Sequence, residues 1–143
     1  MKRIHPTRFG MGLARRVAVV GMIIVLAAVP MAWAGEADKK ILEQRDALLH
    51  NVEDMVAHGG MGDAKAILHH CGEAARSADL LIKQLPAAQP GREEGVVSLK
   101  DVVRHCQRVS EIGLHADPGV LLGPAIKART AARTAVKVLG LVK

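Results

Sequence analysis

Histidines are the residues in this sequence whose type and spacing are best suited to chemistry. Beyond Ala34 they are His50, His58, His69, His70, His105 and His115. Most have a carboxylate at helical spacing, in the sets His50–Asp54–His58, His69–Glu73 and Asp101–His105. Helical residues four apart have Cβ atoms about 5–6 Å apart, so such a pair can chelate one cation. Because imidazole suits copper, nickel and zinc, the pattern predicts a site for a divalent transition metal ion.

Helical geometry limits which of these side chains can act together. His50 and His58 are separated by about 12 Å of helical rise, so one ion does not easily bind both. His50, Asp54 and His58 lie opposite the apolar face of their helix, and we expect them to face water. His70 lies at the edge of an apolar stripe, where it can meet a neighbouring helix. An alternative explanation needs no metal: these histidines are solvated surface residues or are hydrogen-bonded at a helix interface.

Signatures of enzymes are missing from the sequence. It has no Cys-x-x-Cys-His for haem, no glycine-rich phosphate loop and no His-x-x-x-His of a zinc protease helix. Ser77, Ser98 and Ser110 stand in ordinary helical or capping contexts, so no hydrolytic triad can be assembled. We expect a protein without enzymatic activity and without an organic cofactor.

Two cysteines, Cys71 and Cys106, fall at the centres of apolar stripes. An oxidising compartment would favour a disulfide between them. If the third helix begins at Ser98, however, the two cysteines differ in level by about 9 Å, more than the ~4.4–6.8 Å between Cα atoms that a disulfide needs. A disulfide, a Cys/His metal site with His70 or His105, and two buried thiols therefore remain as alternatives.

Residues 53–62 (EDMVAHGGMG), followed by His70 further along the chain, resemble the repeat of the small metal-binding protein family. The resemblance covers residues 45–84 well and 100–137 poorly, since Ile112 and Pro124 replace histidines in the second half. It implies a secreted, histidine-rich helical bundle that binds copper, nickel and zinc for buffering, storage or delivery, with this chain as a histidine-depleted member. Together with the spacing it ranks the ligands as His58 and His70, then His50, Asp54 and His105, then Glu53, His69 and Glu73.

A basic stripe near the C-terminus supplies an alternative function. No acidic residue follows Asp117, and Arg129, Arg133 and Lys137 recur at a spacing of one helical turn. Such a stripe predicts a helical adaptor that docks on an anionic membrane surface or an acidic partner. It is also explained as the solvated face of the last helix.

The elements that position these residues are four predicted helices. Their apolar residues recur at helical spacing over about 36–58, 63–85, 98–113 and 117–139. The boundary signals are Gly59–Gly60, an Asp63 cap, Pro86, a Ser98–Asp101 capping box and an Asp117 cap before Pro118. Residues 86–97 have the composition of a linker. Gly123–Pro124 is expected to kink the last helix or delay its start.

The two halves of the chain resemble each other when Gly59 is aligned with Gly113. At the same offset the pairs Ile67/Leu121, Leu68/Leu122, Ala74/Ala128 and Ala78/Ala132 follow. No segment alternates with a period of two. The sequence therefore predicts an all-α protein, an antiparallel four-helix bundle made of two similar helical hairpins at about 36–85 and 98–140.

Residues 1–34 have the pattern of a secretory signal peptide. Basic residues reach Arg16, an apolar stretch runs from residue 17 to 29, and Ala32-Trp33-Ala34 forms a small-x-small exit. We expect cleavage after Ala34 and a single domain of residues 35–143 in the periplasm or outside the cell. The alternative is a retained membrane anchor, although Pro30 interrupts the stretch.

Composition argues against nucleic acid as a partner. The only aromatic residues, Phe9 and Trp33, precede the expected cleavage point, so the remainder has no ring on which bases could stack. The net charge of +6 also depends on that segment, because it carries five basic residues and no acidic one. The charges of the remainder nearly balance. The sequence leaves the oligomeric state open.

Overall fold

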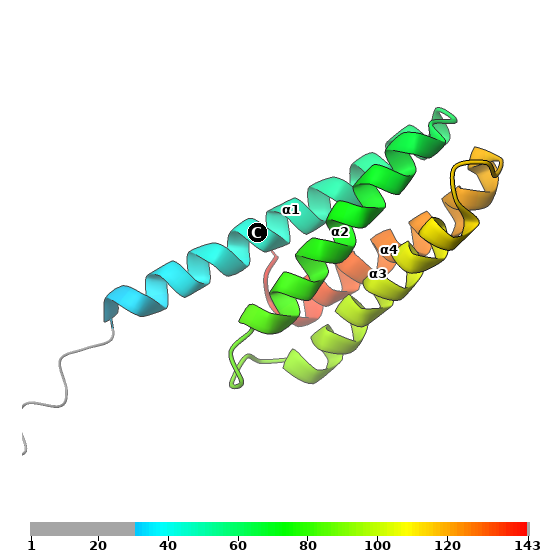
Figure 1. Ribbon diagram of the computed structural model, residues 1–143. Coiled ribbons are helices and arrows are strands. Elements are labelled where there is room, and N and C mark those ends of the chain that lie inside the picture. Colours follow the sequence, from blue (N-terminus) through cyan, green and yellow to red (C-terminus); the bar gives the residue numbers. More distant parts are fainter. Residues whose placement is uncertain (1–30, 143) are drawn as a thin grey trace, which may run out of the picture.

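The chain folds into four long helices connected by short turns (Figure 1). The computed structural model describes residues 31–142, with side chains from residue 35 onward. The helices are α1 (Met31–Gly60), α2 (Ala64–Gln84), α3 (Arg92–Ile112) and α4 (Pro118–Val138), and this part of the chain contains no strand. The all-α prediction is confirmed.

The helices pack as an antiparallel four-helix bundle. α1 packs on α2, α2 on α3, α3 on α4, and α4 returns to α1, while the described backbones of α1 and α3 lie diagonally across the bundle. The predicted apolar stripes of α1 and α2 are buried, including Leu48, Val52 and Ile67. Aliphatic side chains and alanines form this core, which suits close helix packing. The N-terminal turns of α1 project beyond the other helices in Figure 1, and Ile41 is the first buried residue among the described side chains of α1.

The internal repeat is visible in the burial pattern of the two hairpins. Most buried residues of one hairpin have a buried counterpart on the other, in the pairs Ile41/Gly95, Arg45/Leu99, Leu48/Val102, Val52/Cys106, Met55/Val109, Ile67/Leu121, Cys71/Ala125, Ala74/Ala128, Ala78/Ala132, Leu81/Ala135 and Leu85/Leu139. The hairpins therefore use equivalent positions to build one shared core.

Local capping signals account for most helix boundaries. The Asp63 carboxylate accepts a hydrogen bond from the Ala66 amide at 2.9 Å, and the Asp117 carboxylate accepts one from the Gly119 amide at 2.7 Å. Both satisfy amides that the first turn of a helix leaves without a partner. α1 ends at Gly60, and α2 ends before Pro86, as the sequence predicts.

The predicted start of the third helix is wrong. α3 begins at Arg92, not at Ser98, and only residues 85–91 connect it to α2. Gly91 precedes α3 in the left-handed conformation (φ +68°). Glu93 and Glu94 in the first turn stabilise the helix start, because their negative charges interact with the positive end of the helix dipole. Ser98 and Asp101 therefore lie inside the helix and form no capping box.

The buried face of α3 contains Leu99, Val102, Cys106 and Val109, whereas Val103 is half-buried and Ser110 is exposed. α4 begins at Pro118 without delay and passes through Pro124.

Arg45 is a buried cation that ties the end of the chain to α1. Its guanidinium donates a hydrogen bond to the Leu141 carbonyl oxygen at 2.8 Å and another to the Asp46 carboxylate at 2.8 Å. Only 4% of Arg45 is exposed. These hydrogen bonds compensate the buried charge of Arg45. The equivalent position of the second hairpin is occupied by the apolar Leu99.

The predicted signal peptide falls largely outside the described residues. Of that segment, the structure describes residues 31–34, whose backbone is helical and continues into α1. Among the helices of residues 31–142, none combines the length and apolar character needed to cross a bilayer.

Candidate functional site

Four histidines and one aspartate gather where α1 and α2 face each other near their connecting turn. This histidine patch consists of His50, Asp54, His58, His69 and His70. The rings of His58 and His70 are stacked, with centroids 5.4 Å apart and planes 15° apart. The His69 ring meets His70 edge-on at a centroid distance of 5.1 Å. The helical hairpin thus brings together His58 and His70, the two residues that the sequence ranks first.

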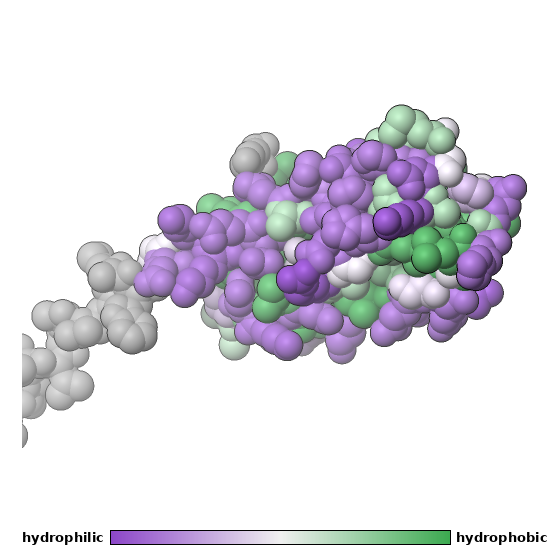
Figure 2. Space-filling model, turned by 45° about the horizontal axis from the view of Figure 1, so that its top comes forward, coloured by the Kyte–Doolittle hydropathy of each residue, from purple (hydrophilic) through white to green (hydrophobic). Residues whose placement is uncertain are grey.

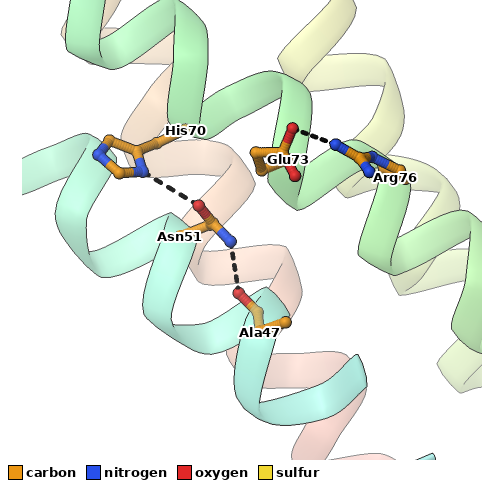
Figure 3. A network of polar contacts seen from close by, with 5 residues as sticks. All are labelled: Ala47, Asn51, His70, Glu73 and Arg76. Atoms are coloured by element: carbon orange, nitrogen blue, oxygen red, sulfur yellow. Dashed lines mark hydrogen bonds and ion pairs between the residues drawn. The ribbon is translucent and has the colours of Figure 1, made fainter. Parts of the chain in front are cut away.

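Asn51 fixes the orientation of the His70 ring. Its side-chain amide nitrogen donates to the Ala47 carbonyl oxygen at 2.9 Å, and its amide oxygen lies 3.0 Å from Nδ1 of His70 (Figure 3). Since an amide oxygen can only accept, Nδ1 of His70 carries a proton and donates a hydrogen bond to Asn51. The lone pair of His70 is therefore on Nε2, which points away from Asn51 in Figure 3.

The surroundings of His70 favour its neutral form. Partial burial lowers the pKa of His70 below its ordinary value of 6.5, and the neighbouring His69, His58 and His50 lower it further, against the opposing effect of Asp54. A neutral imidazole retains the lone pair that a metal ion requires.

His50 and Asp54 form a more exposed pair at one side of the patch. Nε2 of His50 lies 3.2 Å from the Asp54 carboxylate, one turn apart on α1. The exposed fraction of the side chain is 73% for His50 and 34% for Asp54. The expectation that His50 faces water agrees with this arrangement, whereas Asp54 and His58 are half-buried.

The other carboxylates near the patch are engaged by arginines. Glu53 pairs with Arg133 at 2.6 Å and with Arg129 at 3.7 Å, both from α4. Glu73 forms an ion pair and hydrogen bond with Arg76 (Figure 3). Glu53 and Glu73 thus neutralise cations in this structure, which makes them poorer metal ligands than Asp54.

His105 lies apart from the histidine patch. It lines a shallow groove between α3 and α4 together with Asp101, Lys127 and Thr130. Burial, Arg104 and Lys127 lower the pKa of His105, while Asp101 opposes them. Because the described backbones of α1 and α3 lie diagonally across the bundle and His105 faces the α3–α4 groove, His105 and His58 do not contribute to one site.

The side chains of the patch are not arranged as a finished metal site. Over the residues that the structure describes, no three histidine, cysteine, aspartate or glutamate side chains form a group able to hold a metal ion. The stacking of His58 on His70 gives the reason, because lone pairs lie in the ring plane and nearly parallel rings direct them side by side. A rotation of the His58 side chain is needed before both nitrogens can reach one ion.

The two thiols meet in the core between α2 and α3. Cys71 and Cys106 are buried free thiols, and hydrogen bonding with Cys106 together with burial raises the pKa of the Cys71 thiol. The expected difference in level between them is wrong because α3 starts at Arg92. Cys71 and Cys106 are then almost equally far from Gln84 and Arg92, the helix ends that face the α2–α3 connection. Within the described part of the chain, neither thiol joins the histidine patch in a metal-binding group.

Comparison with known proteins found no matching family model, no matching curated protein and no matching solved structure.

Proposed function

We propose that this protein binds a divalent transition metal ion (copper, nickel or zinc) through His58 and His70, without enzymatic activity. The observation that carries the proposal is the hydrogen bond from His70 Nδ1 to Asn51, which leaves the Nε2 lone pair of His70 available. Histidines that bind metals usually donate their other ring nitrogen to an oxygen in this way, which fixes the tautomer and makes the ligand more basic.

The second ligand is His58, whose ring already lies against His70. Its imidazole is half-buried near the end of α1, where a rotation about the side-chain bonds brings a nitrogen toward the Nε2 atom of His70. Asp54 is the carboxylate of the patch, and its charge acts on His70. The exposed His69 can complete the coordination from the solvent side, whereas His50 lies two turns before His58 on α1 and is paired with Asp54.

The donor set favours a role in buffering, storage or delivery. For ligand sets of imidazole and carboxylate, affinity rises along the first-row divalent metals, is highest for copper and falls again at zinc. Affinity alone therefore does not identify the metal that this protein binds in the cell. The surface position of the patch allows an ion to enter and leave without opening the core. The proposal includes the resemblance to the small metal-binding protein family. It also includes export to the periplasm or the exterior of the cell. If the signal peptide is cleaved after Ala34, mass spectrometry of the exported protein should find Gly35 at its N-terminus.

The test is calorimetric titration with Cu²⁺, Ni²⁺ and Zn²⁺. We expect the double variant His58→Ala/His70→Ala to lose roughly tenfold or more in affinity with an unchanged helical circular dichroism spectrum, because neither residue belongs to the buried core. His115→Ala is the matched control, since His115 is an exposed histidine of the α3–α4 connection. Undiminished binding by the double variant would contradict the site, and no binding by the parent would contradict the function.

The alternative function, docking through the basic face of α4, has weaker support. Glu53 pairs with Arg129 and Arg133, so part of the basic stripe is neutralised within the protein. Sedimentation with vesicles of anionic lipid distinguishes the two functions. Salt-sensitive co-sedimentation by a protein that binds no metal would favour docking over metal binding.

A further inference from the structure

We propose that Cys71 and Cys106 form an intramolecular disulfide that joins the two helical hairpins, wherever the protein folds in the presence of a disulfide donor. The proposal rests on the position of the two thiols in the core and does not depend on metal binding.

Helix boundaries place the two cysteines at the same level of the bundle. α2 and α3 run antiparallel on either side of residues 85–91, so levels can be counted from Gln84 and Arg92, the ends that face this connection. Counted in this way, Cys71 and Cys106 differ in level by a single residue, which corresponds to about 1.5 Å of helical rise. This is small against the ~4.4–6.8 Å between Cα atoms that a disulfide spans.

The two thiols also share one part of the core. Cys71 and Cys106 are 0% and 2% exposed and belong to the same core cluster, and Cys106 is the neighbour that raises the pKa of Cys71. Two cysteines at one level of packed neighbouring helices are placed where a disulfide can join them. The other members of that cluster are apolar, so each thiol has the other as its polar neighbour there.

Oxidation occurs by thiol–disulfide exchange with a protein or small-molecule disulfide. One cysteine thiolate attacks the donor disulfide and expels a thiol, and the second cysteine then attacks the mixed disulfide and expels the other thiol. The two cysteines lose two protons and two electrons, and the donor is reduced to two thiols. The hydrogen bond and burial raise the pKa of Cys71 in the folded protein, so exchange takes place before the bundle closes.

The experiment is refolding of the full reduced chain in a mixture of reduced and oxidised glutathione. After unfolding and alkylation, we expect a mass lower by two hydrogen atoms, no alkyl group added and a linked pair of peptides containing Cys71 and Cys106. The melting temperature should rise by roughly 10 °C or more over that of the reduced chain, because the closed loop restricts the unfolded state. The matched control is Cys71→Ala, which should gain no stability from the same treatment.

Burial supplies a second measurement. A reductant added to the folded oxidised protein should leave the bond intact, and the same reductant should cleave it in denaturant. Full alkylation of both cysteines after refolding with glutathione would overturn the proposal. Rapid reduction in the folded state would also overturn it, since the sulfur atoms would then not be held in the core.

Discussion

Asn51 is the residue on which the proposed chemistry depends most directly, although it binds no metal itself. Replacement by alanine leaves His70 Nδ1 without its oxygen acceptor and lets the ring exchange tautomers. We predict that Asn51→Ala weakens Cu²⁺ and Ni²⁺ binding about 10–100-fold with an unchanged helical spectrum, as for other lost partners of metal-binding histidines. Calorimetric titration measures the change, and equal affinity of variant and parent would show that the tautomer is fixed by something other than Asn51.

The lowered pKa values of His70 and His105 predict how stability depends on pH. Each histidine binds its proton more weakly in the folded protein than in the unfolded chain, where the pKa is 6.5. Between the folded and the unfolded pKa, unfolding therefore takes up protons. The free energy of unfolding is then largest above pH 6.5, falls as the pH drops toward the folded pKa values, and levels off below them.

Urea unfolding of the metal-free protein at neutral pH and at about pH 5 checks this sign. The double variant His70→Gln/His105→Gln should lose most of the dependence in that range. Stability that increases on acidification would contradict the direction given for both groups. Protonation of His70 also removes its lone pair, so bound metal should be released over the same range of pH.

At the scale of helices, the connection between α2 and α3 gives the sharpest prediction. Gly91 has φ +68°, and a Cβ atom there would overlap the Val138 carbonyl oxygen. We predict that Gly91→Ala lowers the free energy of unfolding by about 2–4 kcal/mol, from the left-handed conformation and the overlap together. Gly62→Ala is the matched control, because Gly62 has φ +82° with open space around it and should cost only about 1–2 kcal/mol. Denaturant unfolding compares the two variants, and equal losses would remove the contact with Val138 as the cause.

The helix boundaries that local chemistry determines were predictable from the sequence. Asp63, Asp117 and Gly60 act through their own turn of helix, so their signals need no tertiary structure. The start of α3 depends on a distant contact instead, because Gly91 and Gly95 lie against Val138 and Leu139 near the other end of the chain. A segment that contains these glycines has the composition of a linker, so composition alone does not predict that α3 extends back to Arg92.

The candidate site was predicted in part for the same reason. Spacing along one helix identified His50, Asp54 and His58, and the apolar edge suggested that His70 meets a neighbour. Asn51 meets His70 only because of the register in which α1 packs against α2. The sequence of α1 alone does not reveal that register, so the role of Asn51 could not be predicted. The predicted difference in level between Cys71 and Cys106 was wrong because the predicted start of α3 was wrong; both cysteines lie in the same core cluster.

For the whole molecule, the core is complete without any ion. The buried cluster consists of apolar side chains from all four helices, and the histidine patch lies outside it. We therefore predict that a chelator leaves the far-ultraviolet circular dichroism spectrum unchanged. Structural zinc sites behave differently, because their apparent binding free energy of about 10–16 kcal/mol supplies the folding energy. Loss of helical signal on chelation would mean that the ion holds the helices together.

The surfaces of the two hairpins are chemically unequal despite their equivalent cores. Figure 2 shows a hydrophilic side along the molecule and an apolar area near one end. Met61, Leu114 and Val120 are exposed apolar residues that lie in or beside the connections α1–α2 and α3–α4. Equivalent buried positions thus coexist with different surfaces, and the histidine patch belongs to the first hairpin alone.

The hydrogen bond from Arg45 to Leu141 has a consequence for the order in which the chain assembles. It joins residues 96 positions apart, whereas each hairpin is closed by a turn of a few residues. We therefore expect this contact to form late, after the two hairpins have docked, because long-range contacts carry the larger loop-closure cost. Arg45→Ala should therefore accelerate unfolding and leave the refolding rate nearly unchanged in stopped-flow measurements over a range of urea. If the whole loss of stability appeared instead as slower refolding, the contact between Leu141 and α1 would already be formed in the transition state.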